Sequence, residues 1–239
     1  MNPVLQAADD LLTQQAAQIA TLEKQANTKV FDNLELTPWL LAPGTAANTG
    51  STGSSATATQ GQPGVSCAWF KLAPKGPYAN GYWYNQLGAD ATRTSFTYDL
   101  RFMFGTAIDA AASQAVELDI QQVIGGVVYN MGWQFDFADN ALRVWNRSGK
   151  TWVKTGKPCL RWIQGQWIHI LAEQHRIGGN VIHDAITING LRLPIDMSFP
   201  APTLGLNDML NCAIQLDGNK AGATYQIYLD AIKFNAGVL

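Results

Sequence analysis

Apolar and polar residues alternate with a period of two from Val65 onward, which is the pattern of half-buried β-strands. Turn residues separate the alternating segments, and Asn189-Gly190 is the strongest hairpin signal among them. Since no helical pattern lies between the segments, the sequence predicts an all-β antiparallel β-sandwich rather than an alternating α/β fold. The predicted strands are Ser66–Leu72, Gly81–Tyr84, Ser95–Phe104, Val116–Val123, Val127–Phe137, Leu142–Asn146, Trp167–Arg176, His183–Ile188, Leu191–Ile195, Asn211–Leu216 and Thr224–Phe234.

Residues 3–27 have a different pattern, which predicts an N-terminal α-helix. Pro3 suits a first helical turn, and Gln15 interrupts an otherwise apolar seam with spacings of three and four. The seam can form a coiled coil that makes the protein a homo-oligomer, or an amphipathic helix that lies on the sandwich. Its positions are Leu5, Ala8, Leu12, Gln15, Ile19, Leu22 and Ala26.

Between Pro43 and Gly64 the chain is rich in Gly, Thr, Ser and Ala and has no large apolar side chain. Such a segment cannot bury enough apolar surface to offset the entropy lost on ordering it. We therefore expect three parts: a helix with its connector over residues 1–42, a linker over 43–64, and the sandwich over 65–239.

The segment Val116–Val123 carries the clearest candidate site. Because side chains alternate along a strand, Glu117, Asp119 and Gln121 share one face, and the apolar residues between them share the other. Two acids and an amide are costly to bury without partners. Their face should therefore open to solvent, a ligand or a metal, while the apolar face contributes to the core.

This strand resembles the catalytic strand of the laminarinase and carrageenase glycoside hydrolases, which have the concanavalin A-like jelly roll. Their pattern is Glu-x-Asp-x-Glu, or a bulged form with one more residue before the last Glu. The resemblance implies that Glu117 is the nucleophile and Asp119 its support, but Gln121, or Gln122 in the bulged form, replaces the general acid. Retaining hydrolysis needs two carboxyl groups about 5 Å apart. We therefore expect no cleavage of β-glucans, agarose or carrageenan.

Four short motifs extend the resemblance from Val65 to Phe234: Glu117–Gln121, Tyr129–Gln134, Trp162–His169 and Tyr228–Ile232. They make this stretch similar to the laminin G-like and concanavalin A-like domains of uncharacterised secreted bacterial proteins. The resemblance implies an antiparallel jelly-roll β-sandwich of the concanavalin A-like type, to which the N-terminal helix is appended.

Tryptophan is frequent, with 8 residues, and sugar rings stack on exposed aromatic faces. Trp133 adjoins Gln134 on the strand expected to neighbour the polar strand, and Trp145 lies nearby in the sequence. Packing in the core is the alternative role for each of these tryptophans.

Two histidines, His169 and His175, share one face of a predicted strand with Glu173. Such a row could bind a metal or act as acid and base. We favour a hydrogen-bonded outer face, because no further ligand is identifiable. If the protein were an enzyme, the candidates would be Glu117, Asp119 and His169, with His169 paired to a Tyr in a lyase.

Composition narrows the partners. A net charge of −2 gives no field to attract nucleic acid or anionic lipid, and no apolar run is long enough for a membrane helix. The charged fraction of 14% favours an exported protein, whose signal peptide is absent or removed. Cys67, Cys159 and Cys212 fit no metal spacing, and they allow one disulfide or three buried thiols.

Together these patterns predict a secreted, non-catalytic carbohydrate-binding or surface-adhesion module that binds a polysaccharide on its concave sheet. No cofactor is expected, although calcium stays open. Two alternatives also stay open: a divergent glycoside hydrolase or polysaccharide lyase, and a structural spike or fibre head assembled through the N-terminal helix. The expected ligand contacts are Glu117, Asp119, Gln121, Asn130, Trp133, Gln134 and Trp145.

Overall fold

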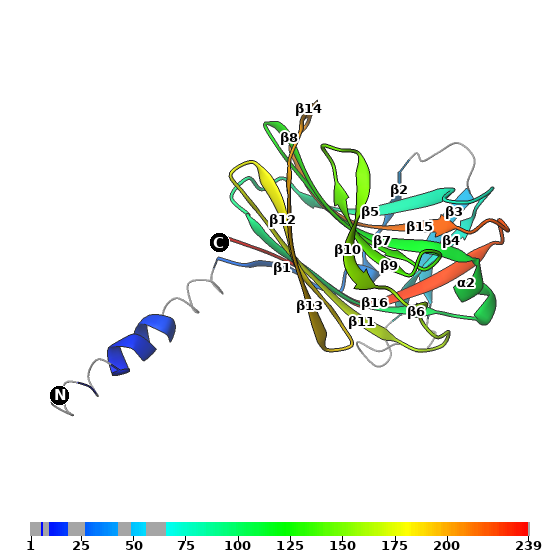
Figure 1. Ribbon diagram of the computed structural model, residues 1–239, viewed down its shortest axis with the longest axis horizontal. Coiled ribbons are helices and arrows are strands. Elements are labelled where there is room, and N and C mark those ends of the chain that lie inside the picture. The colour runs from blue at the N-terminus through cyan, green and yellow to red at the C-terminus, as the bar shows by residue number, and fades with distance from the viewer. Residues whose placement is uncertain (1–5, 7–9, 19–26, 43–48, 56–65, 239) are drawn as a thin grey trace.

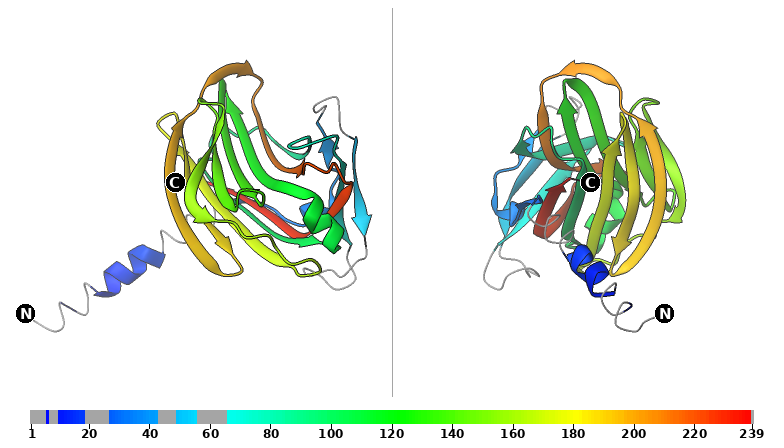
Figure 2. Two further views of the ribbon diagram at one scale, coloured as in Figure 1. Left: turned by 45° about the vertical axis from the view of Figure 1, so that its right-hand side comes forward. Right: turned by 90° about the vertical axis from the view of Figure 1, so that its left-hand side faces the viewer.

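Two antiparallel eight-stranded sheets form the sandwich in the computed structural model, which describes residues 6, 10–18, 27–42, 49–55 and 66–238 (Figures 1 and 2). The sheet called here the β6 sheet has the order β13 (Leu191–Pro200), β12 (Asn180–Ile188), β11 (Ile168–Ile177), β6 (Ser95–Phe104), β16 (Tyr225–Gly237), β4 (Cys67–Ala73) and β3 (Thr49–Ser55), with β1 (Lys29–Phe31) beside β16. The β7 sheet has the order β10 (Thr151–Pro158), β9 (Ala141–Asn146), β8 (Gly126–Asp136), β7 (Ser113–Ile124), β15 (Met209–Gly218), β5 (Asn80–Gly88) and β2 (Leu40–Leu41), with β14 (Thr203–Leu206) beside β8. The predicted antiparallel jelly-roll sandwich is confirmed.

The core lies between the two sheets and is formed by alternate residues of their strands. Burial of large apolar side chains is the main favourable contribution to such a fold. The largest fully buried side chains are Trp83, Trp133, Tyr98, Tyr225, Phe70, Phe96, Phe102, Phe104, Phe135, Phe234, Leu72 and Leu100. Because these residues face inward, the polar residues that alternate with them face away from the core.

Three short elements within residues 65–239 were not predicted. Half of the residues of β10 and all of those of β14 are exposed, and neither strand has a buried residue, so neither carries a strong apolar alternation. The helix α2 (Ala107–Ala112) is only 6 residues long, and a capping box between Thr106 and Asp109 stabilises its start. Short exposed elements of this kind leave little hydrophobic pattern in a sequence.

The predicted linker is wrong over Thr49–Ser55, and the predicted start of the sandwich at residue 65 is too late. β3 pairs with β4 along its whole length, while β1 and β2 pair with β16 and β5. Small residues are needed here because β3 lies close to two indole rings. A Cβ atom at Gly50 would lie 2.7 Å from Trp83, and one at Gly53 would lie 2.8 Å from Trp69. The remaining residues of the predicted linker lie outside the described residues.

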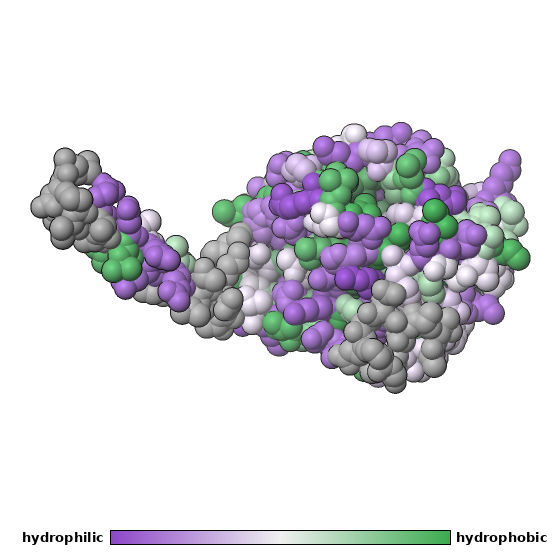
Figure 3. Space-filling view, turned by 90° about the horizontal axis from the view of Figure 1, so that it is seen from below, coloured by the Kyte–Doolittle hydropathy of each residue, from purple (hydrophilic) through white to green (hydrophobic). Residues whose placement is uncertain are grey.

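Residues 10–18 are helical, as predicted, and all of them are exposed to solvent. The helix projects from the sandwich, and its apolar patch is visible in Figure 3. Leu11 is 54% exposed and Leu12 is 63% exposed. The interpretation that this stretch lies on the sandwich is therefore wrong. The coiled coil stays a prediction, since the rest of the seam lies outside the described residues.

If the helix forms a coiled coil, the full chain should sediment as an oligomer, and Leu12→Lys should convert it to a monomer. A charge in the seam would have to be buried at the helix interface, which is unfavourable. Analytical ultracentrifugation of both chains measures the masses. The matched control is Gln14→Lys, which adds the same charge outside the seam. A monomeric wild-type protein would contradict the coiled coil and the fibre-head alternative that depends on it.

All three cysteines are buried thiols. Burial raises the pKa of Cys159 and of Cys212 to about 12, and that of Cys67 to about 11. Such thiols stay protonated and behave as small apolar side chains. The described helices include none that is long and apolar enough to cross a membrane.

Candidate functional site

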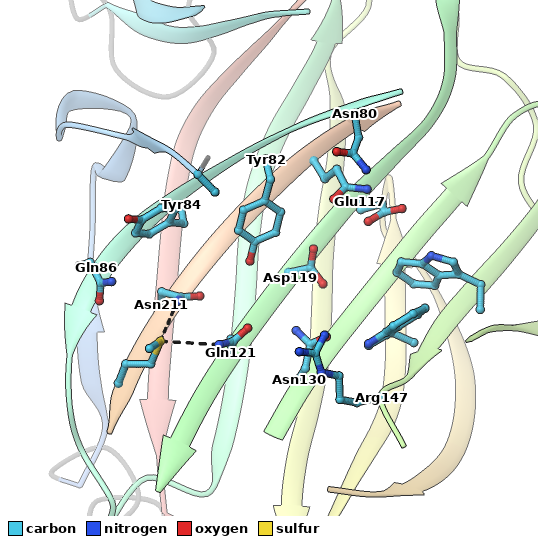
Figure 4. A pocket seen from close by; sticks show the side chains of 15 residues that line it. Asn80, Tyr82, Tyr84, Gln86, Glu117, Asp119, Gln121, Asn130, Arg147 and Asn211 are labelled. Carbon is cyan, nitrogen blue, oxygen red and sulfur yellow. Dashed lines mark hydrogen bonds between the residues drawn. The ribbon is translucent and has the colours of Figure 1, made fainter. Parts of the chain in front are cut away.

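A hollow of about 520 Å³ opens on the face of the β7 sheet that points away from the core (Figure 4). Its lining residues come from one edge of the sheet to the other, so this face is concave. They are Ala42, Asn80, Tyr82, Tyr84, Gln86, Glu117, Asp119, Gln121, Asn130, Trp145, Arg147, Trp152, Met209, Asn211 and Gln215. Five of the predicted ligand contacts are among them: Glu117, Asp119, Gln121, Asn130 and Trp145.

The polar strand β7 forms the floor of this hollow, between β8 and β15. Its register with β8 is continuous from Ala115 to Ile124, so β7 has no bulge in this stretch. Gln121 therefore stands at the position of the general acid in the resembling hydrolases. Gln122 points away from the hollow, and its Nε2 donates to the carbonyl oxygens of Asp90 and Arg93. The bulged alignment is wrong.

The two acids of β7 are more enclosed than the sequence predicted. Glu117 is 4% exposed and Asp119 is 5% exposed, so they line a buried floor rather than an open face. Gln134, directly opposite Glu117 on β8, donates from Nε2 to Glu117 Oε1 at 2.7 Å. Gln134 is itself buried and does not line the hollow. Its position supports Glu117 rather than a ligand.

Gly132 makes room for the second acid. It lies opposite Asp119 on β8, and a Cβ atom at this position would lie 2.6 Å from Asp119 Oδ1 and 3.0 Å from Trp145 Cβ. The absence of a side chain therefore lets the carboxylate and the indole approach each other. Asn130 and Arg147 also line the hollow, and both lower the pKa of Asp119.

A third acid, Asp217 on β15, was not predicted as a site residue. It is 2% exposed, its side chain lies beside Glu117, and Gln215 Nε2 donates to its Oδ1 at 3.0 Å. The sequence did contain a signal, because Asn211, Gln215 and Asp217 occupy alternate positions on β15 and share the face of Glu117. The predicted strand ended at Leu216, one residue short of this acid.

The three carboxyl groups hold protons more tightly than ordinary acids. Burial, with the like charge of Asp217, raises the pKa of Asp119 to about 7, although Arg147 and Asn130 lower it. Burial likewise raises the pKa of Asp217 to about 7. Burial and the neighbouring charges of Asp217 and Asp119 raise the pKa of Glu117 well above its usual value. The charge of this floor therefore changes near neutral pH.

Two polar atoms at the hollow have no hydrogen-bond partner among the described residues. They are Asn211 Oδ1, on a side chain that is 5% exposed, and Trp145 Nε1. A buried polar group without a partner costs about 1–3 kcal/mol. In addition, Gln121 Nε2 and Asn211 Nδ2 both donate to Met209 Sδ, at 3.6 and 3.5 Å, and a thioether is a weak acceptor. The site therefore has unused hydrogen-bonding capacity.

Aromatic rings form two walls of the hollow. Trp145 and Trp152 lie on paired strands with ring centroids 5.1 Å apart. Tyr82 and Tyr84 come from β5, with centroids 6.4 Å apart. Figure 4 shows the tyrosines on the opposite side of Asp119 from Arg147. Of these rings, only Trp145 was among the predicted contacts.

The prediction that Trp133 contacts a ligand is wrong. Trp133 is 1% exposed, and it packs in the core, with its ring edge-on to His183 at a centroid distance of 5.2 Å. Its Nε1 donates to Gln174 Oε1 on β11 of the other sheet. The alternation of β8 explains the error, since Trp133 follows Gly132 and precedes Gln134, both of which point away from the core.

The histidine row lies on the β6 sheet and outside the hollow. His169 Nε2 is 2.7 Å from Asp99 Oδ1, and His175 Nδ1 is 2.8 Å from Asp184 Oδ1. Glu173 accepts from Arg192 at 2.8 Å. His169 therefore does not join Glu117 and Asp119, and the lyase that uses His169 with a Tyr stays a prediction. Among the described residues, no three His, Cys, Asp or Glu side chains are grouped to hold a metal ion.

Size alone does not distinguish this hollow. A second, of about 640 Å³, lies beside Glu35, and a third, of about 550 Å³, includes His175. Glu35 already accepts a hydrogen bond from the backbone of Ile232, and His175 is bonded to Asp184. The third hollow also includes Gln174, whose buried Nε2 lacks a partner among the described residues. The hollow of the β7 sheet differs because it combines two such atoms with two buried acids, Glu117 and Asp119.

No protein-family model matches this sequence, and no curated protein matches it. Among solved structures, winged bean acidic lectin in complex with methyl-α-D-galactose has a TM-score of 0.51 at 8% identity, over 88% of this chain and 98% of the lectin. Peanut lectin with a bound peptide has a TM-score of 0.48 at 11% identity, over 89% and 98%. Alginate lyase Aly36B has a TM-score of 0.49 at 14% identity, over 72% and 81%. The described chain thus has the concanavalin A-like jelly-roll fold.

Proposed function

We propose that the protein binds a glycan in the hollow of the β7 sheet and does not cleave it. The observation that carries this proposal is the unused hydrogen-bonding capacity of Asn211, Gln121 and Trp145 between two aromatic walls. Pockets for polar ligands combine a few convergent polar groups with aromatic surfaces in this way. An extracellular setting, expected from the composition, is part of the same proposal.

Sugar hydroxyls match the chemistry of this lining. Amide side chains provide a donor and an acceptor together, so each can bind two neighbouring hydroxyls. The faces of Tyr82, Tyr84 and Trp152 offer flat apolar surfaces for the C–H groups of a sugar ring. The winged bean lectin, which shares the fold, was solved with a galactoside, but a shared fold does not transfer a ligand.

Met209 occupies the place of a ligand oxygen in this proposal. Its sulfur accepts from both Gln121 and Asn211, and methionine is flexible enough to move aside. A hydroxyl that replaced the sulfur would form stronger hydrogen bonds with the same two amides. Displacement of this side chain would also uncover Asn211 Oδ1.

A hydrolase is the weaker candidate. Asp217 places a further carboxyl group beside Glu117, but its side chain is 2% exposed and does not line the hollow. Catalytic pairs in retaining glycosidases are separated by about 5 Å and in inverting enzymes by about 6.5–9.5 Å, so that the sugar or a water fits between them. Since Asp217 does not line the hollow, a sugar bound there would not lie between Asp217 and Glu117.

The proposal predicts that Asn211→Ala weakens binding of the tightest glycan by about five- to twentyfold, since it removes one or two net hydrogen bonds. The glycan is first identified with the full chain on a glycan array, and its affinity is then measured by calorimetry. Asn235→Ala is the matched control, because Asn235 bonds Thr97 and lies outside the hollow. Equal affinities of the two variants would place the binding site elsewhere. Absence of any array hit would contradict the function itself.

A further inference from the structure

The hollow has an excess of acceptors over positive charges. Glu117 and Asp119 line it, Asp217 lies beside Glu117, and Arg147 is the one basic residue among the described lining residues. Asp136 and Arg143 lie nearby, but they form a salt bridge with each other, with Arg143 Nη2 3.0 Å from Asp136 Oδ2. One cation therefore faces three acids.

The partners of these acids do not neutralise them. Glu117 receives a hydrogen bond from the neutral amide of Gln134, and the side chain of Asn130 that lowers the pKa of Asp119 is likewise a neutral amide. Neighbouring buried carboxylates repel each other, so ionising all three together is unfavourable without a further cation. A strand that served only to support the fold would be more stable with amides at these positions.

An unpartnered acceptor near the acids points to what is missing. Asn211 lines the hollow with a side chain that is 5% exposed, and its Oδ1 has no hydrogen-bond partner among the described residues. Asn211 on β15 is paired with Gln121 on β7. Asp119 precedes Gln121 by two residues, so both side chains lie on the same face of β7. The floor thus offers carboxylate and amide oxygens, which require a ligand rich in donors.

We propose that the glycan bound here carries free primary amino groups, as in a polymer of deacetylated amino sugars, and that an ammonium group binds between Asp119 and Glu117. This inference rests on the proposed function. An ammonium group has three donors and no acceptor, so it matches a floor of acceptors and supplies the missing positive charge. The faces of Tyr82 and Trp145 add cation–π attraction.

The same geometry disfavours other charged glycans. A uronic acid or sulfate ester would place a negative charge against Asp119 and Glu117, with Arg147 alone to offset it. An N-acetyl group would remove the positive charge and two of the three donors of the amine. Discrimination should therefore follow the charge on nitrogen rather than the shape of the sugar ring.

Binding of an ammonium group should also release protons near neutral pH. The positive charge would favour the ionised carboxylates, which otherwise retain protons. The ionisable groups that face this position are Glu117 and Asp119 of β7, Asp217 of β15, Tyr82 of β5 and Arg147, which follows β9. A neutral sugar bound at the same place would leave the proton count almost unchanged.

Calorimetry with the full chain at pH 7 tests the inference with three hexamers: glucosamine, N-acetylglucosamine and a uronic acid. The glucosamine hexamer should bind at least about tenfold more tightly than either of the others, as expected for a charge-assisted hydrogen bond. Titrations in buffers of different ionisation enthalpy should show proton release for this ligand. Asp119→Asn should reduce the preference to about threefold or less. Asp184→Asn, on the β6 sheet, should leave it unchanged.

The outcomes separate this inference from the proposed function. Equal binding of the three hexamers, or tighter binding of the acetylated or acidic one, would overturn the inference and leave glycan binding intact. Tighter glucosamine binding that survives Asp119→Asn without proton release would also overturn it, since the charge would then be recognised elsewhere. If neither these hexamers nor any glycan of the array binds, the proposed function fails as well.

Discussion

Replacing Trp133 with alanine should lower the free energy of unfolding by about 3–5 kcal/mol, the usual cost of removing a fully buried large aromatic side chain. Trp133 is 1% exposed and packs against His183 between the two sheets. The variant also leaves Gln174 Oε1 without the indole N–H that donates to it. Chemical denaturation followed by circular dichroism measures the effect.

Trp152→Ala is the matched control, since Trp152 lines the hollow on the half-exposed strand β10. It should cost less than about 1.5 kcal/mol of stability, because a partly exposed side chain loses less burial. It should weaken glycan binding instead. The reverse result, with a stable Trp133→Ala variant that has lost binding, would restore Trp133 as a contact and contradict the described core.

Asp119→Asn should stabilise the protein at pH 8 by an amount on the order of 3 kcal/mol and have almost no effect at pH 3. The pKa of Asp119 is raised to about 7 by burial and by Asp217, so the folded state holds this proton where the unfolded state has released it. Stability contributed by the protonated group is therefore complete below about pH 4 and is lost as the pH rises to about 7. Asparagine cannot ionise, and it avoids this loss.

The difference between the variant and the wild-type protein is the quantity to measure, because other groups titrate too. His183 has a pKa lowered to about 3 by burial, so its contribution is present above about pH 6.5 and is lost as the pH falls. This contribution is common to both chains and cancels in the difference. Urea denaturation at pH 3, 5.5 and 8 gives the curve. A variant less stable than the wild-type protein at pH 8 would mean that ionised Asp119 stabilises the fold.

Alternation along single strands was sufficient to predict most of the fold and part of the site. It separated Glu117, Asp119 and Gln121 from the core residues between them, and the structure places all three in one hollow. Applied to β8, the same rule places Trp133 in the core, because Trp133 is adjacent to the polar Gln134 and must face the opposite way. That error came from the choice of an aromatic residue by its distance in sequence rather than by its face.

Features that depend on distant strands could not be predicted in this way. Asp217 and Glu117 are 100 residues apart in number, and only the pairing of β15 with β7 brings them together. The edge strand β3 has the composition of a linker, because its glycines fit under Trp83 and Trp69. Pairing over long sequence separations leaves no local pattern, and small residues are used both in mobile segments and in close packing.

The central claim is tested most directly by soaking crystals of the full protein with its tightest-binding glycan and solving the structure of the complex. We predict that a sugar unit lies in the hollow of the β7 sheet, with Met209 displaced and a ligand oxygen or nitrogen within hydrogen-bond distance of Asn211 and Asp119. One sugar face should stack on Trp152 or Tyr84. A glycan bound on the β6 sheet or beside Glu35, with Met209 still on Gln121 and Asn211, would contradict the account.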